Sequence, residues 1–129
     1  MPIRIVQLGT PRTAGEGVRL GTVRRPPRGI RKTDFARLDF YDVWVPDLAP
    51  SEPLRRWISS QPITPARWAI FARRYRREMR APAASRLVAL LSALSRHGRF
   101  SIGCYCDDES RCHRSLLRDL FKEAGAQVE

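Results

Sequence analysis

The sequence predicts a single α/β domain with a small, mostly parallel sheet flanked by helices. Its length of 129 residues fits one domain. Strand-like segments alternate along the chain with amphipathic helical segments, an order that favours parallel strands. The chain also finishes with a strand, a loop and a helix, which places loop residues at the carboxyl edge of a sheet. We therefore expect residues 1–129 to form one compact unit.

Four segments have the composition of strands, because they contain β-branched and aromatic residues and most lie next to Gly or Pro. A loop with the sequence RRPPRGIRKTD follows the second of them and contains two prolines and five basic residues. The predicted strands cover residues 3–8, 18–23, 40–45 and 100–105.

Four helices are expected from capping residues and 3–4 spacing of apolar side chains. Ser51 and Thr64 are predicted N-caps, each with a proline in the first turn that follows. The third helix contains residues 87–94 and stops before Gly98, and the last stops before Gly125. The helix after Thr64 has an apolar stripe on one face. Its opposite face, which we interpret as solvent-facing, carries Arg73, Arg77 and Arg80.

The formal net charge of +11 is typical of proteins that bind nucleic acid or another polyanion. Only Lys32 and Lys122 are lysine among 24 basic residues, and a bias toward arginine also arises from genome-wide codon composition. The most apolar run, residues 87–94, is too short to span a membrane, and no signal peptide is recognised. We therefore expect a cytoplasmic protein without a cofactor. Its expected partner is a phosphate-bearing small molecule or a nucleic acid, and not a membrane.

All three cysteines and one of the two histidines lie in the segment FSIGCYCDDESRCHRSLLRDLFKEAG, residues 100–125. Ser110 is a plausible N-cap, which makes residues 111–113 the first turn of the last helix. Backbone N–H groups and the helix dipole at such a position favour a bound anion. In a parallel sheet, Arg24 and Arg28 converge on the same edge, because they also follow a strand.

These observations predict a basic cleft for a phosphate-bearing ligand, a nucleotide or a nucleic-acid backbone. We favour a binding module whose affinity falls with salt, and leave open an enzyme that uses His113 for acid–base chemistry at a phosphate or N-glycosidic bond. The predicted ligand-binding residues are Arg24, Arg28, Cys112, His113 and Arg114.

The cysteines can be buried structural side chains, which is the interpretation we favour for Cys104 alone. Two chemical alternatives also remain. In the first, the six-residue loop that begins at Cys106 resembles the active loop of rhodanese, and Cys106 is then the catalytic thiol. Three acidic residues in the loop disfavour this thiol chemistry. In the second, the thiols and a histidine bind zinc. The zinc alternative is disfavoured because alternate residues of a strand point to opposite faces and because two of the ligands would be adjacent in sequence. Its candidate ligands are Cys104, Cys106, Cys112 and His113.

Three segments together carry a resemblance to a known family. They are TVRRPPRGI at residues 22–30, APSEPLRRWI with RWAIFARRYRREM within 49–79, and the terminal strand, cysteine loop and helix. These segments resemble the domain-of-unknown-function family DUF488, in its compact YeaO-like branch. The resemblance covers about residues 3–122 and implies a small α/β fold. It implies no particular reaction, because the function of the family is not established.

The resemblance fails at one segment and extends to a second branch at another. The compact branch has Asp-Arg-Leu-Trp-Pro-Arg-Gly where residues 23–29 read VRRPPRG, so the acidic and Trp positions are lost. Binding of an anion tolerates that loss better than acid–base catalysis does. The terminal loop is similar to the longer branch of the family, in which Glu is more usual at the position of Cys106. Four residues match that branch: Cys104, Cys112, His113 and Arg114.

Overall fold

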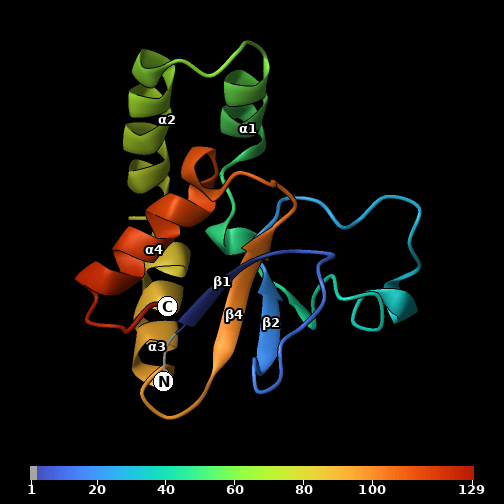
Figure 1. Cartoon of the computed structure of the whole chain (residues 1–129). Helices are drawn as coiled ribbons and strands as arrows, with labels where there is room; N and C mark the ends of the chain where they lie inside the picture. The colour runs from blue at the N-terminus through green and yellow to red at the C-terminus, as the bar shows by residue number, and fades with distance from the viewer. Residues whose placement is uncertain (1–2) are drawn as a thin grey trace.

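The computed structural model describes residues 3–129, which form a four-stranded sheet with helices around it (Figure 1). Every strand pair is parallel and the order is β1-β4-β2-β3, which confirms the predicted α/β class. The strands are β1 (Ile3–Gln7), β2 (Val18–Gly21), β3 (Val43–Trp44) and β4 (Phe100–Cys104).

Strand β4 is one of the two inner strands of the sheet, and all five of its residues are buried. It pairs with β1 on one side, where Ile3 lies opposite Phe100, and with β2 on the other. Gly103 is required in this strand because a Cβ there would lie 2.5 Å from a Leu8 side-chain carbon. Ile3 in the edge strand β1 also forms a bridge with Val128, so the two ends of the described chain lie together at this edge of the sheet.

Four α-helices pack around the sheet, and the capping predictions are confirmed. The side chains of Ser51 and Thr64 accept hydrogen bonds from the backbone N–H groups of Leu54 and Arg67. Figure 1 shows the strands pointing toward the end of the molecule where α1 and α2 stand. The helices are α1 (Glu52–Ser59), α2 (Pro65–Glu78), α3 (Pro82–Leu94) and α4 (His113–Glu123).

The main core joins the sheet to all four helices. Ile102 and Leu117 are fully buried, and so is Tyr75, whose hydroxyl donates a 2.6 Å hydrogen bond to the carbonyl of Leu48. The outer arginines of α2 are exposed, as expected, but Arg67 and Arg74 pack over the ring of Trp57 at 4.5 and 4.9 Å. None of the helices within residues 3–129 is long and apolar enough to cross a bilayer.

The third strand differs most from its prediction over residues 40–45, since only Val43 and Trp44 pair with β2. Asp39 adopts a left-handed conformation with φ of 62°, which turns the chain just before the predicted strand begins. Tyr41 then enters the core and covers Gly21, where a Cβ would lie 2.3 Å from its ring. Packing of this aromatic ring thus replaces strand pairing at the edge of the sheet.

Candidate functional site

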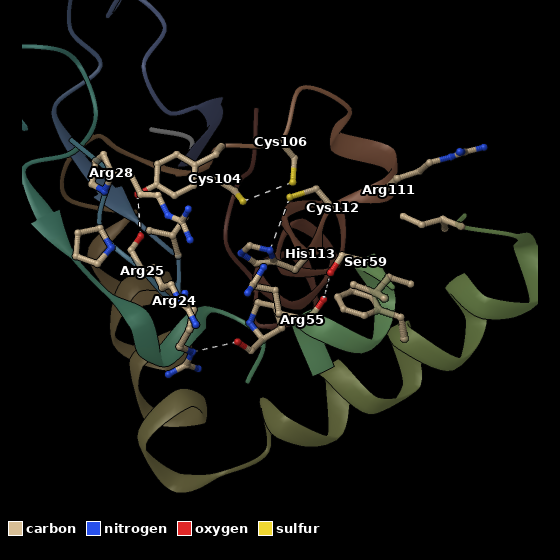
Figure 2. Close-up of a pocket in the computed structure, with 18 of the residues that line it drawn as sticks. Arg24, Arg25, Arg28, Arg55, Ser59, Cys104, Cys106, Arg111, Cys112 and His113 are labelled. Atoms are coloured by element: carbon tan, nitrogen blue, oxygen red, sulfur yellow. Dashed lines mark hydrogen bonds between the residues drawn. The ribbon is translucent and has the colours of Figure 1, made fainter. Parts of the chain in front are cut away.

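A pocket of about 950 Å³ opens at the carboxyl ends of β2 and β4 (Figure 2). Its walls come from the loop after β2, from α1 and α2, and from the segment between β4 and α4. This is the edge at which open parallel sheets bind ligands. The residues that line it include Arg24, Arg25, Arg28, Arg55, Phe40, Phe71, Cys104, Cys106, Arg111, Cys112 and His113.

The polar lining of the pocket is strongly basic. Five arginines contribute to its walls, and no Asp or Glu within residues 3–129 does so. Arg25 and Arg55 both contact Glu52, which lies outside the lining. The hydrogen bond from Arg55, together with the charges of Arg25 and Arg56, lowers the pKa of Glu52 to about 2. One carboxylate thus serves several guanidinium groups, and the pocket keeps an excess of positive charge.

The arginines differ in how firmly they are held. Arg24 is anchored, because it donates hydrogen bonds to the carbonyls of Pro50 (3.1 Å) and Ala49 (3.2 Å). Arg28 is exposed and its side chain has no hydrogen bond or ion pair to any residue in 3–129. Figure 2 shows Arg111 extending away from the cysteines. Arg28 is therefore the cation of the pocket most available to a ligand.

Three thiols meet at one end of the pocket. Cys104 is the last residue of β4, Cys106 follows in the loop, and Cys112 is the N-cap of α4. Their Sγ atoms all lie within 4.8 Å of one another, and those of Cys104 and Cys106 are 3.8 Å apart. Cys104 and Cys112 are buried, whereas Cys106 is exposed. Figure 2 shows the three sulfur atoms gathered beside His113.

Hydrogen bonding within the cluster separates the three thiols in acidity. Contacts from Cys104 and Cys106 lower the pKa of Cys112 well below its usual value, against the effect of burial. Contacts with Cys106 and Cys112, together with burial, raise the pKa of Cys104. A contact with Cys104 favours the Cys106 thiolate, but the contact with Cys112 and burial raise the pKa of Cys106 to about 11. Negative charge in the cluster is therefore favoured on Cys112.

His113 is buried and oriented from two sides. Its Nε2 donates a 2.7 Å hydrogen bond to the carbonyl of Thr22, since a carbonyl oxygen only accepts. Its ring lies 5.6 Å from that of Tyr75, and its Nδ1 is 3.7 Å from the Sγ of Cys112. The contact with Thr22 requires a proton on Nε2, and the ring is held with Nδ1 directed toward the thiols.

Arg114 does not lie where the sequence analysis expected. It is 3% exposed and is absent from the pocket lining. Its guanidinium donates 2.6 Å hydrogen bonds to the carbonyls of Val6 and Cys106, and its Nε lies 3.4 Å from the Sγ of Cys112. Arg114 is thus buried next to the thiols, and its hydrogen bonds connect the cysteine loop to β1.

The start of the last helix also differs from the expectation. Ser110 is not the N-cap of α4, because residues 109–111 form a short 3-10 turn and the helix begins at His113. The N–H of Ser110 bonds the Asp108 carboxylate, and those of Arg111 and Cys112 bond carbonyls of the same loop. The N–H groups of residues 110–112 are thus bonded within the loop. With the raised pKa of Cys106, this bonding argues against the rhodanese-like alternative.

Of the predicted residues, the structure brings Arg24, Arg28, Cys112 and His113 to one pocket. Arg25, Arg55 and Arg111 also line the pocket and were not among the residues predicted from the sequence. Arg25 lies in the predicted basic loop, so the predicted site residues Arg24 and Arg28 indicated its position near the pocket. No local signal marks Arg55, because its place depends on how α1 stands over the sheet.

The fold and the pocket define a small α/β protein with a basic site at the carboxyl edge of a parallel sheet. The family model DUF488-N3a, described as the active DUF488-N3 subclade, matches residues 3–125. The chain therefore belongs to the DUF488 family, which confirms the predicted membership. Comparisons with curated proteins and with solved structures give no match.

Proposed function

We propose that this protein binds a phosphate-bearing small molecule of nucleotide size in the pocket at the carboxyl edge of the sheet. The observation that carries this proposal is the lining of five arginines without a carboxylate. Arginine matches the geometry of phosphate, and it remains charged at any physiological pH.

The shape and the apolar part of the pocket favour a nucleotide over a bare anion. Its volume of about 950 Å³ lies near the upper end of the range for small-molecule sites. The side chains of Phe40 and Phe71 contribute aromatic surface, and two isoleucines and three prolines add further apolar surface. A ligand with a planar base and a phosphate satisfies both parts of such a pocket.

Within this proposal the arginines have different roles in ligand binding. Arg24 is held by two carbonyls and supplies a fixed positive charge. Arg28, which has no partner among residues 3–129, supplies the hydrogen bonds that the ligand gains on binding. His113 is fixed beside the thiols and is the group that would carry a proton if binding is followed by a reaction.

Binding is tested by isothermal titration with adenosine monophosphate, ribose 5-phosphate and adenosine, on wild type and on Arg28→Gln. Loss of a charge-assisted hydrogen bond costs about 1.5–3 kcal/mol, so we expect at least tenfold weaker binding of the phosphate compounds. Arg31→Gln is the matched control, because Arg31 is in the same loop, is exposed, and lies outside the pocket.

Equal effects of the two substitutions, or equal affinity for adenosine and its monophosphate, would show that the pocket does not recognise phosphate. Binding that requires an oligonucleotide would replace the small molecule with a nucleic acid. The bound ligand is also followed for turnover. Loss of turnover in His113→Gln with retained binding would identify an enzyme, whereas a protein that never turns over the ligand is a binding module.

A further inference from the structure

We propose that Cys104, Cys106 and Cys112 form a metal site that holds one thiophilic ion, zinc in the first instance, at the end of the pocket. The three sulfur atoms come from the end of β4, the following loop and the N-cap of α4. Segments separated in sequence therefore supply one cluster of ligands of one chemical kind. Thiolates select soft or borderline ions over calcium and magnesium.

The spacing of the sulfur atoms fits an ion between them. Zinc–sulfur bonds are about 2.3 Å long and structural zinc is tetrahedral, so two sulfur ligands lie about 3.8 Å apart. The Sγ atoms of Cys104 and Cys106 are 3.8 Å apart, and both lie within 4.8 Å of the Sγ of Cys112. Binding needs a closure of at most about 1 Å for the looser pairs.

The structure removes the first of the two objections that disfavoured a metal in the sequence analysis. Strand β4 ends at Cys104, so Cys106 is no longer in strand conformation and its side chain turns back toward Cys104. The same geometry corrects the ligand set, because His113 is not part of the cluster whose ligand atoms all lie within 4.8 Å. The site therefore has three protein ligands.

Charge supports the same assignment. Zinc with three thiolates carries a net charge of −1, and the buried guanidinium of Arg114 lies beside it with its Nε 3.4 Å from the Sγ of Cys112. No carboxylate among residues 3–129 forms an ion pair with Arg114. A zinc–thiolate anion would supply the missing counter-charge, and the N–H···S contact would orient the ligand.

The fourth coordination position of the ion would face the pocket and would be open to water or a ligand. All three cysteines are among the lining residues, so water or a pocket ligand can reach the ion. Three protein ligands with one open position is the arrangement of catalytic zinc sites, in contrast to the four ligands of structural sites. The ion would thus adjoin the arginines without depending on whether they bind phosphate.

Zinc binding is measured on reduced, untagged protein that has been freed of metal with a chelator. Zinc is titrated against a chromophoric chelator, and cobalt is used as a spectroscopic substitute that reports sulfur coordination. We expect one ion per chain and a thiolate-to-cobalt charge-transfer band. Coordination requires thiolates, so any thiol protons leave to solvent and affinity falls at low pH.

Cys106→Ser is the decisive variant, because Cys106 is exposed and its loss does not disturb the core. We expect it to lose at least about a hundredfold in zinc affinity, more than the 10–100-fold typical for loss of an outer contact. Asp107→Asn is the matched control, since Asp107 is exposed in the same loop but offers no sulfur. The proposal is overturned if reduced wild type takes up no zinc at micromolar concentration, or if Cys106→Ser binds as well as Asp107→Asn.

The test separates this inference from the proposed function. Metal uptake is measured without any phosphate compound, and phosphate binding is measured on metal-free protein. Zinc uptake without phosphate binding would support the metal site and overturn the proposed function. Phosphate binding without zinc uptake would support the proposed function and overturn the metal site.

Discussion

Two arginines of this protein are almost completely buried, and they are stabilised in opposite ways. Arg19 in β2 binds Glu16 through both nitrogens of one edge, at 2.8 and 3.0 Å, and donates further bonds to two carbonyls. Arg114 in α4 has carbonyls and a sulfur as its partners, and no carboxylate among residues 3–129. The positive charge of Arg19 is therefore balanced by a carboxylate of the protein, whereas that of Arg114 is not.

This difference distinguishes a structural arginine from one near a functional centre. A buried guanidinium without a counter-charge is unfavourable, so hydrogen-bond acceptors or negative charge nearby must stabilise it. At Arg114 two carbonyls accept its hydrogen bonds, and the lowered pKa of Cys112 favours negative charge on the neighbouring sulfur. At Arg19 the charge is fixed on a carboxylate that also accepts a hydrogen bond from Ser101.

The largest effect on the free energy of unfolding is expected at the ion pair of Arg19 with Glu16. Glu16→Gln leaves Arg19 buried without its counter-charge, which typically costs 3–5 kcal/mol, and denaturant unfolding should show this loss. Gln keeps the size of the side chain, so packing is unchanged. A loss below about 1 kcal/mol would mean that the carbonyls alone satisfy Arg19.

The same pair sets a pH dependence. Burial opposes ionisation of Glu16, but hydrogen bonds from Arg19 and Ser101 outweigh it and lower its pKa from 4.5 to about 2. Its contribution to stability is therefore complete above pH 4.5 and is lost as the pH falls toward 2, by about 3 kcal/mol. Glu16→Gln should remove this part of the acid dependence.

At Arg114, which has no carboxylate partner among residues 3–129, we expect stability to depend on bound metal. If zinc binds beside Arg114, an excess of 100 times its dissociation constant raises the free energy of unfolding by about 2.7 kcal/mol. Wild type should show this increase in denaturant unfolding, whereas Cys106→Ser should show little. An equal increase in both proteins would assign the effect to another zinc site.

The smallest effect should come from an arginine that is not buried. Arg76 pairs with Glu123, whose side chain is 58% exposed, and such pairs contribute about 0.2–1 kcal/mol. Glu123→Gln should therefore change the free energy of unfolding by less than 1 kcal/mol, and less still in high salt. A larger loss would show that burial is not what separates the three arginines.

Much of the fold could be predicted from the sequence, because local rules determine it. The caps Ser51 and Thr64, the apolar stripe of α2 and the β-rich segments all report on neighbours in sequence. The third strand could not be predicted in the same way. Tyr41 suits a strand by composition, but it packs over Gly21, a contact between segments that are distant in sequence.

The candidate site was predictable only in part, for a related reason. The spacing of Cys104, Cys112 and His113 marks the loop as chemically unusual. The direction of each side chain depends on tertiary contacts. Ser110 is a good N-cap by composition, but Asp108 caps a 3-10 turn instead and accepts hydrogen bonds from both the N–H and the hydroxyl of Ser110, so the helix begins only at His113. Arg114 has the chemistry of a phosphate ligand, but the carbonyls of the loop and β1 draw it inside.

The position of β4 has a consequence for how the protein is made. This strand is the last of the four in sequence, and it joins β1 to β2, whose other neighbour is β3. The sheet can therefore close only after the residues before Phe100 have been synthesised, and its closure depends on contacts between distant segments, which are slow to form. Before β4 is made, β2 can pair with β3, but β1 has no neighbouring strand. We expect synthesis to be followed by a single late folding step, completed only once Phe100–Cys104 leaves the exit tunnel.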